Sequence, residues 1–256
     1  MGDLISVVLK WARAREHLKT VENAIEAYGK AGPCTIIPQI EPNTGDKIWR
    51  VEGEPRLPPQ LLNPFIGDTL YNYRSALDHL AWQLVLEADI RKPDWKTAFP
   101  IFDDIPLFDR YSPNKLAGMT EPMKAAIKNL QPCYRRNRYR DAVLWALESL
   151  GNIDKHRHFN LILSALDGGL WSGPPMPRRS FRTAFIYSGT VEHGTILARV
   201  SREHVDVNFH PAFGIAFDKS GPTSRDVLFG INEVVAGIIE TFARDFFGQR
   251  LSLPRW

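Results

Sequence analysis

The sequence contains little of what marks small disulfide-bonded scaffolds and the common cofactor sites. Only two cysteines, Cys34 and Cys133, occur in 256 residues, and no Cys-x-x-Cys pair is present. This scarcity argues against a disulfide framework and against a cysteine-rich zinc site. The sequence also lacks a Gly-rich phosphate loop after a strand, a Gly-x-Ser-x-Gly elbow and a His-Glu-x-x-His motif, so it does not indicate the nucleotide-binding, serine-hydrolase or zinc-protease sites that those motifs mark.

Long apolar runs and a strong charge imbalance are missing as well. No stretch approaches the ~20 apolar residues needed to cross a bilayer. Charged residues such as Asp3 and Lys10 interrupt the opening stretch, where a secretory signal would place its apolar region. The formal net charge is only +3, too small to indicate nucleic-acid binding by itself. We therefore expect a cytoplasmic protein that does not insert into a membrane.

Hydrophobic residues make up 44% of the chain, enough for a substantial core, and most of them recur at helical spacing. Asp3 and the pair Thr223/Asp226 resemble caps that begin a first and a last helix. We read the Pro-rich stretch 93–113 as a surface loop. The predicted helices are residues 3–28, 64–87, 113–130, 141–165 and a last one that begins at residue 223.

Elsewhere the hydrophobic period changes to two, which indicates strands. Residues 35–37 and 47–51 predict a short hairpin, and residues 181–188, 195–200, 205–209 and 213–217 predict antiparallel strands. The expected fold is α+β, a helical bundle with a C-terminal antiparallel sheet and a closing C-terminal helix. We expect a mainly helical body with the hairpin over 1–170, and the sheet with the last helix over 171–256, packed as one unit.

The helix predicted over Pro64 to Glu87 carries the most informative residues. Its core stripe includes Tyr73 and Leu77, spaced for one helical face. Arg74 and Asp78 flank this stripe, and His79 points almost opposite it, on the side of Trp82. Because a tryptophan on the water side of a helix is unusual, either the helix is central or its second face meets a partner chain.

The segment Arg74-Ser-Ala-Leu-Asp-His79 has the form Arg-x4-His, which resembles the catalytic motif of the HEPN superfamily of helical proteins, many of them RNases. The resemblance implies a metal-independent, cofactor-free, RNA-cleaving or RNA-binding homodimer. It assigns proton transfer to His79 and phosphate binding to Arg74, while Asp78 orients His79 or pairs with Arg74. The chemistry suits these residues, because histidine titrates near neutral pH and arginine grips phosphate in a bidentate way. Together with the later Asp154-Lys-His-Arg, the motif also resembles a broad group of bacterial proteins that implies no activity.

A second polar motif runs from Gly151 to Phe159. Asp154 and His158, four residues apart, fall on the expected core stripe of their helix. A buried pair of this kind must be hydrogen-bonded, and such pairs are usually structural. As secondary RNA contacts we name Lys155, His156 and Arg157.

A third candidate is the basic stretch from Tyr134 to Arg140, which combines arginines with tyrosines. Arg135, Arg136 and Arg138 suit phosphate binding, and the tyrosines suit base stacking. A solvated basic loop before a helix explains the same pattern equally well.

Two other interpretations of the polar residues remain open. The side chains of Asp78, His79, Asp154, His156 and His158 include enough N and O donors for zinc, iron or manganese in a helical bundle. Against a metal site, Asp78 and His79 are adjacent and diverge by about 100° on a helix. Alternatively, the chain is a non-catalytic binding or scaffold protein whose Arg/Asp/His cluster is structural.

Overall fold

The chain divides into two compact units, each assembled from segments far apart in the sequence. The computed structural model describes residues 2–134, 138–173, 184–217 and 223–254. One unit comprises Met1–Val21, Asn63–His158 and Val227–Trp256, and the other comprises Glu22–Leu62 and Phe159–Asp226. Residue 170, where the sequence analysis placed a boundary, lies within a strand of the second unit.

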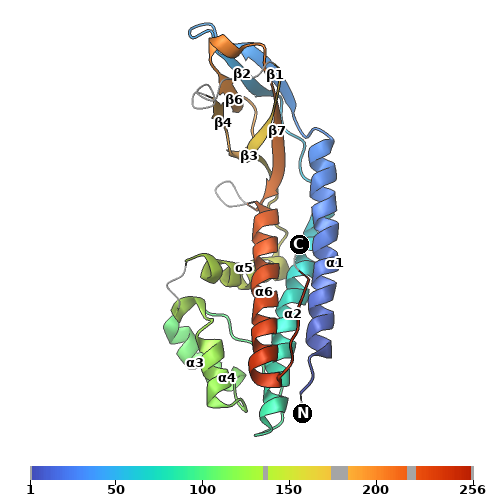
Figure 1. Ribbon diagram of the computed structural model, residues 1–256, viewed down its shortest axis with the longest axis vertical. Helices are drawn as coiled ribbons and strands as arrows, with labels where there is room; N and C mark the ends of the chain where they lie inside the picture. Colours follow the sequence, from blue (N-terminus) through green and yellow to red (C-terminus); the bar gives the residue numbers. More distant parts are fainter. Residues whose placement is uncertain (1, 135–137, 174–183, 218–222, 255–256) are drawn as a thin grey trace. The chain divides into compact units, whose positions relative to one another are not determined.

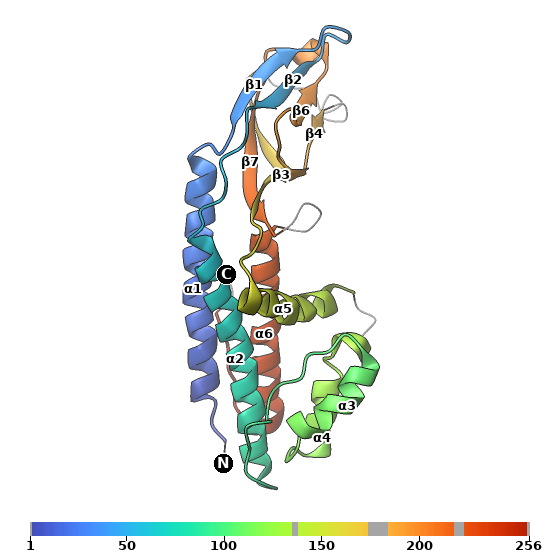
Figure 2. The ribbon, with the colours of Figure 1, turned by 180° about the vertical axis from the view of Figure 1, so that it is seen from behind.

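The first unit is built on three long helices. These are α1 (Ile5–Lys30), which belongs to this unit as far as Val21, α2 (Leu62–Ala88) and α6 (Ser224–Phe247). In Figure 1 the axes of these three helices are roughly aligned with one another. A fourth helix, α5 (Arg138–His156), lies across them, as Figure 2 also shows. The predicted helices over 3–28 and 64–87 and the closing C-terminal helix are confirmed.

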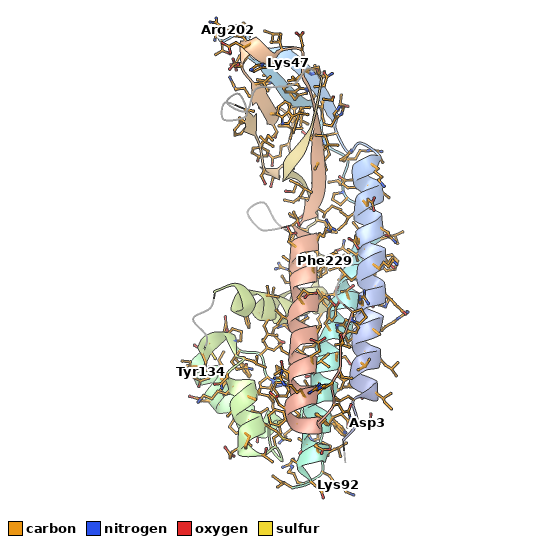
Figure 3. The ribbon with its side chains drawn as sticks, viewed as in Figure 1. Asp3, Lys47, Lys92, Tyr134, Arg202 and Phe229 are labelled. Carbon is orange, nitrogen blue, oxygen red and sulfur yellow. The ribbon has the colours of Figure 1, made fainter. Side chains whose placement is uncertain are left out.

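The helices α1 and α2 run antiparallel. Figure 3 labels Asp3 at the start of α1 and Lys92 just beyond the end of α2, at the same end of the helical unit. The backbone N–H of Asp3 donates to Oε1 of Gln83 at 2.9 Å, and that of Gly2 donates to Oε2 of Glu87 at 2.9 Å. These bonds fix the start of α1 against the last turns of α2.

The core of this unit lies between the apolar stripes of the long helices. The hydroxyl of Tyr73 on α2 is fully buried and donates to Oδ1 of Asn232 on α6 at 2.9 Å, so each buried polar group satisfies the other. The predicted apolar stripe of α2 is buried over its whole length: Leu70, Tyr73, Leu77, Leu80 and Leu84.

The region between α2 and α5 differs from the prediction. Residues 105–113 were expected to lie in a loop, but α3 (Ile105–Lys115) begins there, with Asp104 as its N-cap. The Asp104 carboxylate accepts from the N–H of Leu107 at 2.9 Å. The single helix predicted over 113–130 is also wrong, because the chain turns at Gly118 and a separate helix, α4 (Glu121–Lys128), follows.

The second unit holds two antiparallel sheets. The hairpin predicted at 35–37 and 47–51 is confirmed, and its second strand also pairs with a late strand of the chain. One sheet has the order β1-β2-β6-β4, and the other has the order β5-β3-β7. The strands are β1 (Thr35–Ile40), β2 (Lys47–Glu52), β3 (Ile162–Ser172), β4 (Phe185–Ile186), β5 (Gly189–Thr190), β6 (Ile196–Val200) and β7 (Asn208–Ala216).

Aromatic rings from both sheets form the core of the second unit. The Trp49 ring on β2 meets the Trp171 ring on β3 edge to face at 5.5 Å, and the Phe209 ring on β7 lies 4.7 Å from Trp171. Edge-to-face pairs of this kind stabilise a core beyond the area that they bury. The Lys47 ammonium caps the cluster, since it lies over Trp49 and donates to the carbonyls of Val205 and Val207.

The late strands confirm an antiparallel α+β fold but correct several boundaries. Residues 162–165 were expected to end a helix, but they begin β3, which continues to Ser172. In place of the strands predicted at 205–209 and 213–217 there is one strand, β7, and residues 205–207 lie before it. Of the strand predicted at 181–188, residues 181–183 lie outside the described residues. No described helix has the length and apolar character needed to span a membrane.

Candidate functional site

Arg74 and Asp78 clamp the backbone of one residue, Phe99, in the loop that follows α2. Nη2 of Arg74 donates to the carbonyl of Phe99 at 2.6 Å, and the N–H of Phe99 donates to Oδ1 of Asp78 at 2.9 Å. The two side chains also pair with each other, with Nη2 and Oδ1 3.2 Å apart. Of the two predicted roles for Asp78, the structure therefore has the ion pair with Arg74.

Two further charged side chains complete this cluster. Nε of Arg74 lies 3.6 Å from Oε2 of Glu148 on α5, and Lys115 at the end of α3 is close enough for its charge to interact with the others. Burial raises the pKa of Asp78, while Arg74 and the Phe99 N–H oppose that rise. Burial and then the charge of Arg74 lower the pKa of Lys115. The result is a half-buried group of two cations and two carboxylates that joins α2, α3 and α5.

His79 lies on the other flank of α2, beside α1. Its imidazole is half-buried, and no hydrogen bond reaches it from the residues that the structure describes. Burial and then the positive charge of Lys10 lower its pKa, and Asp78 opposes this to a smaller extent. The neutral imidazole is therefore favoured at neutral pH, and this is the form that accepts a proton.

Within one chain the structure does not bring Arg74 and His79 into contact. Five residues apart, they diverge by about 140° around the helix. Between them runs an exposed strip of α2, on which 63% of Tyr71 and 41% of Trp82 are accessible to solvent. Trp82 is thus partly exposed within one chain, and the expectation that this second face of the helix meets a partner chain stays a prediction.

The second polar motif lies at the end of α5, which stops at His156. The expectation that Asp154 and His158 lie in the core is wrong, because both are exposed. The helix ends before Leu161 and Ala165, which were expected to continue its apolar stripe, and these two residues belong to β3 and its approach instead. Lys155, His156 and Arg157 are exposed too, and Nζ of Lys155 donates to Oδ1 of Asn152 at 3.3 Å.

Although Asp154 is exposed as a residue, its carboxylate lies against α2. A Cβ atom added at Gly67 would be only 2.5 Å from Oδ1 of Asp154, so glycine leaves the space that this approach needs. Partial burial and the nearby Asp68 raise the pKa of Asp154, and His158 opposes them. The Asp154 carboxylate therefore marks where the end of α5 meets α2.

The part of the chain that the structure describes does not form a site from the remaining candidates, which are the basic stretch and the possible metal ligands. Arg135 and Arg136 lie outside the described residues, and Arg138 begins α5 with a side chain that is not described. Among the described residues no group of three or more His, Cys, Asp and Glu side chains is arranged to hold a metal ion.

Sequence reasoning missed three contributors to these surroundings. Lys10, Lys115 and Glu148 come from α1, α3 and α5, and each acts on a residue of α2. No local spacing in the sequence connects them to the Arg-x4-His motif, because helix packing alone brings them there. The chain matches no protein-family model, no curated protein and no solved structure.

Proposed function

We propose that this chain is a metal-independent RNA-binding protein that cleaves RNA in the manner of HEPN ribonucleases, with α2 as its working surface. One observation carries the proposal: His79 is half-exposed, free of hydrogen bonds to described residues and held toward its neutral form beside a lysine. An imidazole in that state is a competent general base near neutral pH.

The cleavage step follows from these groups. Neutral His79 takes the proton of a ribose 2′-hydroxyl, and the 2′-oxygen attacks the adjacent phosphorus. The P–O5′ bond breaks, and the leaving 5′-oxygen takes a proton from solvent, which gives a 2′,3′-cyclic phosphate and a 5′-hydroxyl. The positive charge of Lys10, beside the exposed strip, stabilises the negative charge that grows on the phosphate.

A homodimer completes this arrangement in the proposal. Because Arg74 and His79 of one chain lie on different flanks of α2, Arg74 of a second copy is the better placed to meet the phosphate at His79. Ile5 and Leu9 on α1 support such a pairing, since 69% and 64% of these apolar side chains are exposed.

The direct test replaces His79 with alanine and follows cleavage of a single-stranded RNA in the presence of EDTA. The wild-type chain should cleave, and His79→Ala should lose the activity while its circular dichroism spectrum and melting temperature stay unchanged. The matched control is His204→Ala, since His204 lies in the short helix η3 (Arg202–His204) of the other unit and should not alter the rate. Cleavage that needs a metal ion, or that His79→Ala retains, would contradict the proposal.

A second candidate function is supported by the Phe99 clamp. Two charged side chains that hold the N–H and the carbonyl of one residue act as a structural brace, which suits a non-catalytic binding or scaffold protein. In that case neither the wild-type chain nor any variant cleaves RNA, and His79→Ala lowers the melting temperature because a packed side chain is lost.

A further inference from the structure

The exposed strip of α2 carries two aromatic rings, about three helical turns apart. Tyr71 and Trp82 are both exposed, and eleven residues separate them, which is about three helical turns or 16 Å along the axis. Ser75 and His79 lie between them on the same side of the helix and are half-buried. We call Tyr71, Ser75, His79 and Trp82 the α2 strip.

A positive charge lies beside this strip. The Lys10 ammonium on α1 is 5.6 Å from the centre of the Tyr71 ring, and it also acts on the His79 imidazole. Lys10 takes part in no ion pair with any described residue. Its charge is therefore available to an anion that lies along the strip.

We propose that the α2 strip binds a single strand of RNA, with bases stacked on Tyr71 and Trp82 and a phosphate held by Lys10 between them. This inference rests on the proposed function and names its substrate-binding residues. A distance of about 16 Å spans about five stacked nucleotides at 3.4 Å each, and fewer if the strand is extended. The strand then passes His79, which lies one turn from Trp82.

Stacking and charge together favour a nucleic acid over a protein as the occupant. A seam between two protein chains needs apolar area, but the strip has a serine and a histidine between its two rings, and a lysine without an acidic partner at its side. Aromatic rings combined with a cation that tracks the phosphates are the usual means of binding single strands without sequence preference. The strip should accordingly accept any base.

The test measures binding separately from cleavage. Fluorescence anisotropy follows a labelled oligoadenylate of 2′-O-methyl nucleotides, which lacks the hydroxyl that the proposed cleavage needs. Tyr71→Ala and Trp82→Ala should each weaken binding by about fivefold or more, as expected when one stacked base is lost. Trp82→Phe should retain most of the affinity. The matched control is Trp95→Ala, because Trp95 is 87% exposed on the loop after α2.

The contribution of Lys10 has its own matched control. Lys96 lies over the Trp95 ring at 5.1 Å, so it repeats the geometry of Lys10 over Tyr71 at another place in the same unit. Lys10→Ala should weaken binding and reduce the slope of affinity against salt concentration by about one. Lys96→Ala should change neither quantity.

The outcomes separate this inference from the proposed function. If the wild-type chain cleaves RNA but Tyr71→Ala and Trp82→Ala bind as tightly as wild type, the α2 strip is not the binding surface and the inference fails alone. If the wild-type chain neither binds nor cleaves RNA, both fail. If Trp82→Ala turns a dimer into a monomer and leaves RNA affinity unchanged, the strip is a seam between copies, which also overturns the inference.

Discussion

At the scale of single residues, Arg74 and Asp78 do two things at once. They neutralise each other on one flank of α2, and they satisfy the carbonyl and the N–H of Phe99, which lies in a loop with no regular partner for either group. A buried peptide group that is left unpaired costs about as much as a lost hydrogen bond. The ion pair therefore ties the loop to the helix.

Removal of Arg74 should be costly for this reason. Arg74→Ala leaves the Phe99 carbonyl and two carboxylates without their donor, so the free energy of unfolding should fall by about 1–3 kcal/mol, measured by urea denaturation. Arg91→Ala serves as the control, since Arg91 pairs with Asp94 near the surface and its loss should leave the free energy nearly unchanged. Equal stability of Arg74→Ala and wild type would contradict the clamp.

Part of this residue-level account is visible in the sequence. Arg74 and Asp78 are four apart in a helical stretch, so their ion pair was one of two predicted outcomes. The sequence does not show that both side chains bind the backbone of Phe99, because Phe99 comes from a loop more than twenty residues away. The position of Lys10 is hidden for the same reason, and its charge adds to burial in lowering the pKa of His79.

At the scale of helices and strands, Gly118 separates two helices that the sequence analysis joined. Its φ is +92°, a conformation that side chains rarely adopt, and a Cβ there would lie 2.8 Å from Cγ1 of Val85 on α2. The chain therefore needs glycine at this turn both for its backbone and for its packing. In the sequence a lone glycine inside a helical pattern does not by itself mark a break.

Two glycine substitutions should act in opposite directions. Gly118→Ala should lower the free energy of unfolding by about 1–3 kcal/mol because it forces strain into the turn. Gly151→Ala, within α5 and with no atom within 4 Å of the added methyl group, should raise it by about 0.5–1 kcal/mol through helix propensity. Thermal unfolding followed by circular dichroism measures both. A neutral Gly118→Ala would mean that α3 and α4 tolerate another turn.

The strand β3 shows what periodicity cannot decide. Residues 161–165 continue the apolar spacing of α5, and this spacing predicts a helix through them with Asp154 and His158 in its core. A short apolar run fits a buried strand and a buried helix equally well. Pairing with β7 and β5, both more than twenty residues later, decides the outcome. The fold class was predicted correctly all the same, since the helices and the late strands are strongly patterned.

At the scale of the whole molecule, both units depend on contacts between distant segments. The hairpin strand β2 pairs with β6, about 150 residues later, and α6 returns to α2 through Tyr73 and Asn232. The hairpin was predicted to belong to the helical body because the sequence does not show that β2 pairs with the distant strand β6. Such pairings depend on how the whole chain packs, and no local sequence motif predicts them.

The proposed homodimer belongs to this scale. Leu9→Glu places a charge on the exposed apolar side of α1, so it should convert a dimer into a monomer, as measured by light scattering coupled to gel filtration. Leu57→Glu is the matched control, because Leu57 is 83% exposed in the other unit and should leave the mass unchanged. A wild-type chain that is monomeric at all concentrations would contradict the dimer.

The central claim, that His79 works as a base on RNA, is tested most directly by the pH dependence of cleavage in the presence of EDTA. Only the neutral imidazole accepts the proton, and the pKa of His79 is lowered from its ordinary value of 6.5. The rate should therefore rise with pH, with a midpoint below 6.5, and reach a plateau toward neutral pH, while His79→Ala stays inactive throughout. Absence of cleavage at every pH, or a wild-type profile that His79→Ala reproduces, would contradict the account.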